Sequence, residues 1–215
     1  MQPDKQVYLF DFDGTLVDSM PTYVSVMLRI LDEYSIPYGE DIVRIITPLG
    51  YRGTAEYYRT LGVTASVEEL MARMSAYALE AYRTSIPEKD GVGDALRALK
   101  ARGASLNVLT ASPHAALDPC LKRLGLWDLF DNVWSCDDFD TTKADPNIYV
   151  RAAQCLGVSV EDVIFLDDNL NAIKTAKCAR MRVFGVYDDS SADCAEEMRA
   201  VSECYVQHFS QLLQG

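Results

Sequence analysis

The sequence has few basic residues and no long apolar stretch. Its 20 Lys and Arg residues stand against 32 Asp and Glu, a formal net charge of −12. Nucleic acids and anionic membranes repel an acidic surface, so neither is an expected partner. No apolar run approaches the roughly 18 residues needed to cross a bilayer, and no secretory signal pattern precedes the first strand-like run. We therefore expect a cytoplasmic protein with no membrane partner.

Paired cysteine spacing is also absent. The six cysteines are scattered without a CxxC pair, which argues against a zinc site or a redox motif. Most of them lie among apolar residues of helix-like or strand-like segments. We expect small buried thiols in a reducing compartment rather than disulfides. The six are Cys120, Cys136, Cys155, Cys178, Cys194 and Cys204.

The 215 residues show two different patterns of apolar residues. Residues 16–87 carry apolar side chains at helical spacing, with Pro21 in a first turn and Ser66 as an expected N-cap. The rest alternates strand-like and helix-like segments, which is typical of a parallel α/β sheet. Expected strands are 7–12, 104–109, 132–135, 163–166 and 183–186, and expected helices are 90–99, 114–124, 146–156, 170–179 and one at the C-terminus.

This alternation predicts a Rossmann-like, doubly wound parallel sheet built from residues 1–15 and 88–215. Residues 16–87 are then an all-helical cap inserted after the first strand. The linkers Leu16–Met20 and Ser85–Lys89 are expected to act as hinges, so that closure of the cap would exclude water from the reaction.

Acidic and hydroxyl side chains stand at the ends of the predicted strands. Ligands of an open parallel sheet bind beyond the carboxyl ends of its strands, so these residues converge at one edge. Lys143 lies between the third and fourth strands, just ahead of a helix. The strand-end residues are Asp11 with Asp13, Thr110, and Asp167 with Asp168.

This set indicates phosphate chemistry with a divalent cation. Carboxylates packed together repel one another unless a cation joins them, and oxygen ligands beside a phosphate suit Mg²⁺. A lysine, a hydroxyl and backbone N–H groups would stabilise the phosphoryl group. One carboxylate can attack phosphorus, and a second can protonate the leaving oxygen and later activate water. Asp11 and Asp13 supply these two groups.

Four motifs in register resemble those of the haloacid dehalogenase (HAD) superfamily. They are Asp11-Phe-Asp-Gly-Thr15, Val108-Leu-Thr110, Lys143-Ala-Asp-Pro146 and Phe165-Leu-Asp-Asp168. The resemblance spans nearly the whole chain and includes the helical insertion after the first motif. It is strongest to the phosphoglycolate phosphatase and β-phosphoglucomutase-like subgroup.

The resemblance implies a Mg²⁺-dependent phosphatase that acts on a small phosphorylated metabolite, as a monomer or a homodimer. Asp11 would be the nucleophile that forms an aspartyl-phosphate, and Asp13 the general acid and base. Thr110 and the backbone N–H of Ala111 would bind the phosphoryl oxygens. Lys143 would orient the nucleophile and offset charge in the transition state.

The resemblance also implies a metal site. Its ligands would be the carboxylates of Asp11 and Asp167 and the backbone carbonyl of Asp13, with Asp168 as a further ligand or a support. Asp167 and Asp168 are also expected to cap the helix that begins near residue 170.

Two positions depart from the motifs in ways that bear on function. Ala111 stands where Asn is usual, and Asn171 stands where a further acid is frequent. A backbone N–H can still bind phosphate at the first position, and an amide oxygen can still accept at the second. Ala144, where Pro is frequent, changes nothing essential.

Alternative functions follow from the same residues. A phosphosugar mutase of the β-phosphoglucomutase type would return the phosphoryl group from Asp11 to a sugar. A catalytically weak binding protein is suggested by Ala111 and Asn171. A signalling receiver combines similar groups, but there the acid pair precedes the lysine and no helical domain intervenes. A dehalogenase would not need the acid at Asp13.

Other polar residues are weaker candidates. Arg52 could reach a substrate from the cap, although a solvated arginine is the simpler interpretation. His114 could line the edge of the sheet or simply begin a helix. The acids Asp137, Asp138 and Asp140 are expected in a solvated loop, with a contact from Asp138 or Asp140 to Lys143 as an alternative.

Overall fold

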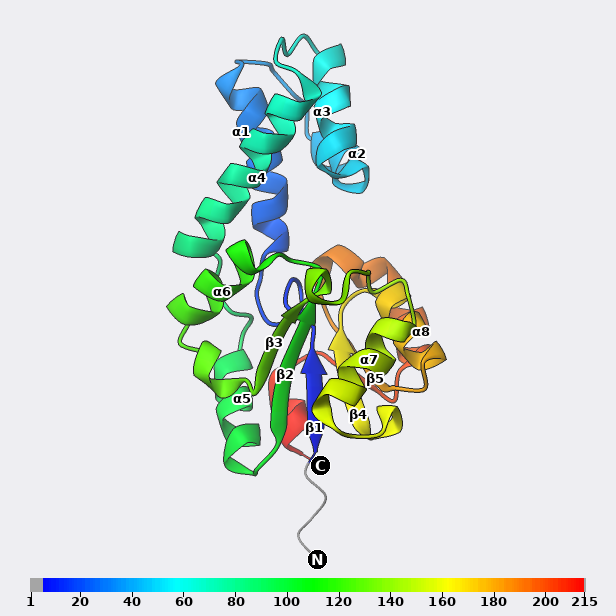
Figure 1. Ribbon diagram of the computed structural model, residues 1–215. Helices are drawn as coiled ribbons and strands as arrows, with labels where there is room; N and C mark the ends of the chain where they lie inside the picture. Colours follow the sequence, from blue (N-terminus) through cyan, green and yellow to red (C-terminus); the bar gives the residue numbers. More distant parts are fainter. Residues whose placement is uncertain (1–5, 215) are drawn as a thin grey trace, which may run out of the picture. The chain divides into compact units, whose positions relative to one another are not determined.

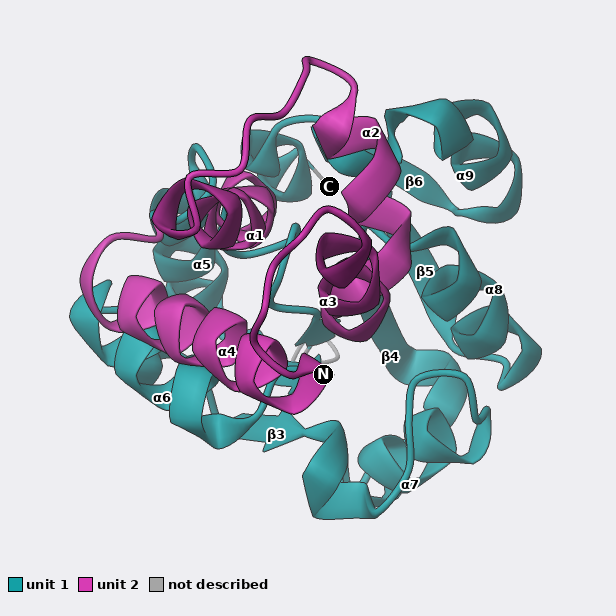
Figure 2. Cartoon of the chain, turned by 90° about the horizontal axis from the view of Figure 1, so that it is seen from above, with its two compact units in different colours: residues 1–18, 87–215 teal, residues 19–86 magenta. Residues whose placement is uncertain are grey.

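The computed structural model describes residues 6–214, which divide into two units (Figures 1 and 2). One unit contains the described parts of Met1–Asp18 and Pro87–Gly215, and the other contains Ser19–Ile86. We call them the α/β unit and the helical unit. None of the helices within residues 6–214 is long and apolar enough to cross a bilayer.

The α/β unit is built on one parallel sheet of six strands in the order β3-β2-β1-β4-β5-β6. Helices α5 and α6 lie on one face of the sheet and α7 and α8 on the other (Figures 1 and 2). The strands are β1 Val7–Phe10, β2 Ser105–Thr110, β3 Asn132–Ser135, β4 Val163–Asp167, β5 Arg182–Val186 and β6 Cys204–Val206. The helices are α5 Val92–Ala101, α6 His114–Arg123, α7 Asn147–Leu156, α8 Leu170–Cys178 and α9 Ala195–Val201.

The predicted fold class, a doubly wound parallel sheet, is confirmed. The central strands β1 and β4 are apolar and buried on both faces, which is typical of a parallel sheet covered by helices. The register pairs Phe10, the last residue of β1, with Val108 of β2 and with Leu166 of β4, so the three strands end within two residues of one another. Their carboxyl ends therefore present side chains at a common edge.

The prediction was incomplete at the C-terminus. The final helix is short, and the three-residue strand β6 follows it and pairs with β5 at the edge of the sheet. Three residues are too few for a periodic signal. The first strand also ends at Phe10 rather than at residue 12, because the chain turns there: Leu16 and Val17 both donate backbone hydrogen bonds to the carbonyl of Phe12.

The helical unit contains α1 Met20–Glu33, α2 Ile42–Ile46, α3 Gly50–Thr60 and α4 Val67–Thr84. Its core is formed by apolar side chains that include Met27, Ile30 and Leu70, with the Tyr58 hydroxyl donating to the carbonyl of Met27 at 3.0 Å. The Ser66 side chain caps α4 by accepting from the amide of Glu69, as predicted. A single turn of 3-10 helix, Thr47–Leu49, directly precedes α3.

The segments on either side of the insertion pair with each other inside the α/β unit. Val17 and Glu88 form an antiparallel bridge, and Asp18 donates to the carbonyl of Pro87 at 3.0 Å. The expected hinge segments are thus partly held by backbone hydrogen bonds.

The cysteines are only partly as expected. All six are free, but only Cys120 and Cys136 are buried, whereas Cys155 and Cys178 are exposed. Helices α7 and α8 place these two thiols on their outer sides, and apolar neighbours in the sequence did not show this.

Candidate active site

Asp11 follows β1 at the carboxyl edge of the sheet. Its backbone amide continues the sheet ladder by donating to the carbonyl of Leu166 at 2.8 Å, and its side chain is buried, with the residue 5% exposed. The chain then turns at Gly14, where φ is +71°. A Cβ at this position would lie 2.5 Å from an oxygen of Asp168. Only glycine allows both the left-handed backbone and this close approach.

Lys143 joins two of the strand-end carboxylates. Its ammonium lies 2.7 Å from Oδ1 of Asp11 and 2.8 Å from Oδ2 of Asp167, and it is largely buried. The contact with Asp11 is an ion pair without hydrogen-bond geometry, so Asp11 Oδ1 has no hydrogen-bond partner among residues 6–214. The Tyr149 hydroxyl of α7 holds the segment that carries Lys143 by donating to the Lys143 carbonyl at 3.1 Å.

Three buried carboxylates meet at this edge. Oxygens of Asp11, Asp167 and Asp168 all lie within 4.8 Å of one another. Asp167 comes from the end of β4, and its Oδ1 accepts from the amide of Asn169 at 2.7 Å. The buried Thr15 hydroxyl donates to Oδ1 of Asp168 at 2.9 Å. The loop after β1 and the loop after β4 therefore hold the acids against each other.

The electrostatics of the cluster show an excess of negative charge. Burial, reinforced by the charge of Asp167, raises the pKa of Asp11 to about 7 even though Lys143 opposes the shift. Burial and the charges of Asp167 and Asp11 also raise the pKa of Asp168. Burial lowers the pKa of Lys143, but the two carboxylates outweigh it and raise the pKa overall. The cluster thus contains three carboxylates and one ammonium, which pairs with two of them.

These residues fit a hard divalent cation. Oxygen ligands suit such ions, and two positive charges would balance three carboxylates and one ammonium. Asp11 Oδ1 is buried and forms an ion pair with Lys143 but no hydrogen bond of suitable geometry within residues 6–214, which is consistent with a ligand atom that a cation would satisfy. The predicted contribution of Asp13 is its backbone carbonyl, and its carboxylate is not part of the cluster.

A second group of polar side chains lies at the end of β2. Thr110 is buried, and its hydroxyl accepts from the amide of Ser112 at 3.1 Å. The Ser112 hydroxyl in turn donates to Oδ2 of Asp13. Asp13 lies close enough to contribute to the raised pKa of Asp11. The exposed residue Ala111 lies between Thr110 and Ser112.

Sequence reasoning missed Ser112. The motif ends at Thr110, and a serine before a proline usually indicates a turn. A usable signal was its position, since a hydroxyl two residues beyond the strand end can reach back over the edge of the sheet. The hydrogen bond to Asp13 crosses 99 positions of sequence, and only the fold shows it.

The structure also tests the expectations for the cap of α8, for Asn171 and for Asp138. The cap of α8 is Asn169, whose side chain accepts from the amides of Asn171 and Ala172, rather than the aspartates before it. The asparagine serves because its side-chain oxygen stands next to the first free amides. Asn171 itself is exposed. Asp138 accepts from His114 at 2.9 Å and from the amide of Ser135 rather than pairing with Lys143.

His114 has more partners than expected. Its Nδ1 lies 2.7 Å from Asp118, one turn further along α6, and its Nε2 contacts Asp138 in the 3-10 turn η3, Cys136–Phe139. The two hydrogen bonds raise the pKa of His114. The imidazole therefore links the start of α6 to the segment after β3.

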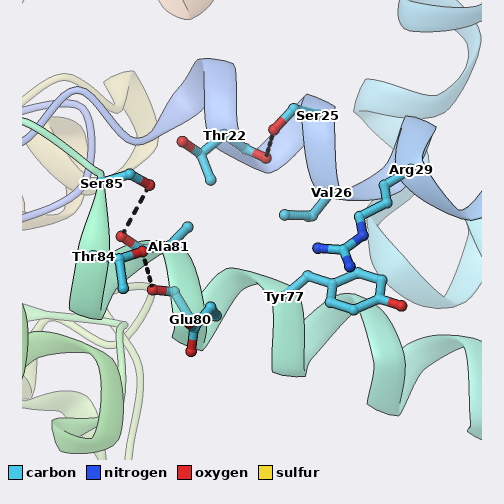
Figure 3. Close-up of a pocket in the computed structure, with 9 residues that line it drawn as sticks. All are labelled: Thr22, Ser25, Val26, Arg29, Tyr77, Glu80, Ala81, Thr84 and Ser85. Atoms are coloured by element: carbon cyan, nitrogen blue, oxygen red, sulfur yellow. Dashed lines mark hydrogen bonds between the residues drawn. The ribbon is translucent and has the colours of Figure 1, made fainter.

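The helical unit has a pocket of its own (Figure 3). It measures about 280 Å³, and residues of α1 and α4 line it. The hydroxyls of Ser25 and Thr84 donate to backbone carbonyls of their own helices, and the Arg29 guanidinium stacks 3.7 Å from the centre of the Tyr77 ring. Arg52, elsewhere in this unit, is exposed and lies 3.8 Å from Glu68. Neither feature contains the buried charges that distinguish the edge of the sheet.

Comparison with known proteins identifies the family. Residues 5–180 match the haloacid dehalogenase-like hydrolase family. A phosphorylated carbohydrates phosphatase of Thermotoga maritima is 30% identical over 183 residues, covering 84% of this chain and 85% of the relative. A phosphoglycolate phosphatase of Psychrobacter arcticus is 28% identical over 194 residues, covering 85% and 84%.

The fold comparison agrees. The crystal structure of a candidate beta-phosphoglucomutase from Thermotoga maritima superposes with a TM-score of 0.83 and 26% identity, covering 97% of each chain. The chain belongs to the haloacid dehalogenase-like hydrolase family, and the resemblance drawn from the four motifs is confirmed.

Proposed function

We propose that this protein is a Mg²⁺-dependent phosphatase that hydrolyses a small phosphomonoester through an aspartyl-phosphate on Asp11. The predicted enzyme class, a phosphoric monoester hydrolase of this family, is supported by the family match and by relatives named as phosphatases. The observation that carries the proposal is the buried cluster of Asp11, Lys143, Asp167 and Asp168 at the carboxyl edge of the sheet.

Asp11 is suited to attack phosphorus. It stands at the end of a rigid buried strand, which fixes the direction of its side chain. Lys143 pairs with its Oδ1, so the other oxygen is the one available for attack. In the reaction a bond forms between that oxygen and phosphorus while the bond from phosphorus to the leaving oxygen breaks. Lys143 then offsets negative charge that develops on the phosphoryl group.

Asp13 is suited to move the proton. It would protonate the leaving oxygen, and then accept a proton from the water that hydrolyses the aspartyl-phosphate. The Ser112 hydroxyl holds the Asp13 carboxylate from the loop after β2. Thr110, with the backbone of Ala111, stands at the end of β2, where phosphoryl oxygens would be bound. These roles rest on placement and on the family's motifs.

Asp11, Asp167 and Asp168, with the backbone carbonyl of Asp13, would hold Mg²⁺. When bound, the ion supplies positive charge that screens the acids from one another and draws the phosphate towards Asp11. Thr15 keeps Asp168 in place through its hydroxyl. The excess of carboxylates over ammonium groups supports this assignment.

We further propose that the helical unit, predicted as residues 16–87 and compact over Ser19–Ile86, acts as the cap that selects the substrate. The names of the relatives support a phosphorylated sugar or another small phosphorylated metabolite. Exchanging this unit for that of a relative would change the order of preferred substrates if the assignment is right. An unchanged order would contradict it.

A phosphosugar mutase is the second candidate. The structural similarity to a candidate beta-phosphoglucomutase supports it, because the two chains match over 97% of their lengths. The two functions differ in the fate of the aspartyl-phosphate. A phosphatase hydrolyses it, whereas a mutase returns the phosphoryl group to a sugar.

The test is a screen of the purified protein against sugar phosphates, phosphoglycolate and nucleotides, with Mg²⁺ and with a chelator. Release of inorganic phosphate that requires Mg²⁺ supports the phosphatase. Isomerisation of a sugar phosphate without net release of phosphate supports the mutase. Binding of phosphorylated ligands without turnover would contradict both, and would indicate the catalytically weak binding protein.

A further inference from the structure

Lys89 is the last residue of the second linker and lies beside the loop that follows β1. Its backbone amide donates to the carbonyl of Leu16 at 3.0 Å, next to the bridge between Val17 and Glu88. Its side chain is only 17% exposed, which is unusual for a lysine outside an active site. The side chain therefore points inward, where an ammonium needs partners.

The Lys89 ammonium has a partner for each of its three protons. It donates to the carbonyl of Gly14 at 2.7 Å, to the carbonyl of Tyr187 at 2.6 Å and to Oδ2 of Asp188 at 2.8 Å. Gly14 belongs to the loop after β1, and the other two belong to the segment after β5. The Lys89 side chain thus connects the second linker, the loop after β1 and the segment after β5.

The Asp188 carboxylate that pairs with this ammonium is itself buried and held by hydrogen bonds. It is 4% exposed, and its Oδ1 accepts from both the amide and the hydroxyl of Ser190, at 2.9 Å and 2.6 Å. Burial raises its pKa, but the hydrogen bonds from Lys89 and Ser190 outweigh this and lower the pKa overall. Asp188 is therefore charged at neutral pH and fixed on both oxygens.

The Gly14 peptide, whose carbonyl accepts from Lys89, lies between two residues with proposed roles at the site. Gly14 separates Asp13, the proposed acid and base, from Thr15, which donates to Asp168. The Gly14 amide donates to the carbonyl of Val17 at 3.0 Å, and its φ of +71° sets the direction in which the loop turns. A rotation of this peptide would move Asp13 and Thr15 together.

We propose that Lys89, held by Asp188, is a positioning residue that fixes the Gly14 peptide and thereby sets the place of Asp13. This inference rests on the proposed function, since it concerns the position of Asp13, the proposed acid and base. Lys89 acts through the loop, so the expected effect is on kcat more than on KM.

The test compares Lys89→Met with Lys174→Met. The first removes the buried ammonium and keeps the length of the stem, while the second removes an exposed ion pair with Glu197 in the same unit. Two quantities are measured: steady-state kinetics on the best phosphomonoester, and hydrogen exchange of the amides of Gly14, Leu16 and Val17 in the protein without Mg²⁺ or substrate.

We expect kcat of Lys89→Met to fall by about 10- to 100-fold with KM within about threefold, because misplacing a catalytic group by about 1 Å costs on the order of 100-fold. The loop amides should exchange faster than in Lys174→Met. Lys89→Arg should recover part of kcat, because it returns a cation to the same carbonyls. If Lys89→Met does not fold, Asp188→Asn supplies the same two measurements with the lysine still present.

The inference is overturned if kcat and loop exchange of Lys89→Met match those of Lys174→Met, or if exchange rises while kcat does not change. A protein that turns over no phosphomonoester would contradict the proposed function. The exchange measurement would then decide alone whether Lys89 fixes the loop.

Discussion

The carboxyl edge of the sheet and the helical unit differ in how far their charged side chains are buried. At the edge, Asp11 and Asp167 are almost completely buried and Lys143 is largely buried, although they come from segments far apart in the sequence. In the helical unit, Glu33 is paired with Arg29 and Arg73, but all three side chains keep contact with water. The core of that unit is apolar, and its buried polar residues, Ser19 and Thr54, carry no charge.

The comparison supports the carboxyl edge of the sheet as the proposed reaction site. Moving a charge out of water is costly, and an excess of like charges adds to the cost. A chain that buries three carboxylates with one lysine gives up stability, which is typical of a site that a ligand completes. The exposed pairs of the helical unit cost little and contribute little. The first arrangement points to chemistry and the second to an ordinary surface.

The largest test of this contrast compares Asp11→Asn with Glu33→Gln, each of which replaces a carboxylate by an amide of similar shape. Asp11→Asn should lower kcat on the order of 10⁴-fold or more, because the proposed nucleophile is lost. Glu33→Gln should leave kcat on a small phosphomonoester within about twofold. Phosphate release measures both. Comparable losses in the two variants would show that buried charge does not mark the reaction site.

The next test adds Mg²⁺ and follows thermal unfolding. Mg²⁺ at 100 times its dissociation constant should stabilise the protein by about 2.7 kcal/mol, since it binds only the folded state. Asp167→Asn should lose this effect, and Glu33→Gln should keep it. An equal gain in both variants would place the ion elsewhere.

Stability without Mg²⁺ should depend on pH with a definite sign. The pKa of Asp11 is raised to about 7 in the folded protein, from about 4 in the unfolded chain, so the folded state binds more protons between these values. The contribution of Asp11 should therefore become less favourable as pH rises from about 4 to 7. The difference in unfolding free energy between the wild type and Asp11→Asn isolates it. A difference that moves in favour of the wild type with rising pH would contradict the assignment.

A smaller effect is expected at Ser112. Ser112→Ala removes the donor to Asp13 and should lower kcat by about tenfold, the size of one hydrogen bond to a charged group. Ser112→Thr retains the hydroxyl and serves as the matched control. If both variants lose the same amount, the loss comes from the shape of the loop and not from the hydrogen bond.

The smallest effect concerns His114, whose pKa is raised by hydrogen bonds to Asp118 and Asp138. A histidine with a raised pKa stabilises the folded state below its unfolded pKa of about 6.5, and this is lost as pH rises through the folded pKa. Because the side chain is 40% exposed, the effect should stay below about 1 kcal/mol. Urea unfolding of wild type and His114→Gln should differ more at pH 6 than at pH 9. A difference that is constant or grows with pH would exclude this origin.

Much of the architecture could be predicted from local pattern. The strand at 132–135 has the predicted bounds, and four others differ from theirs by one or two residues at one or both ends, because buried apolar runs and glycine breaks are local signals. The strand Cys204–Val206 could not be predicted, since it depends on the edge of β5 being available. The exposure of Cys155 and Cys178 depended in the same way on which side of each helix faces the sheet.

Residue identities and their order in the chain were enough to predict the family and five of the six strands, because buried apolar runs mark these strands and the four motifs follow one another in a fixed order. The tertiary structure alone decided the contacts between loops: Ser112 on Asp13, and Lys89 on the Gly14 peptide. Such contacts span many positions and depend on the path of each turn. No periodic pattern encodes that path, because it is set by packing among segments that are distant in the sequence.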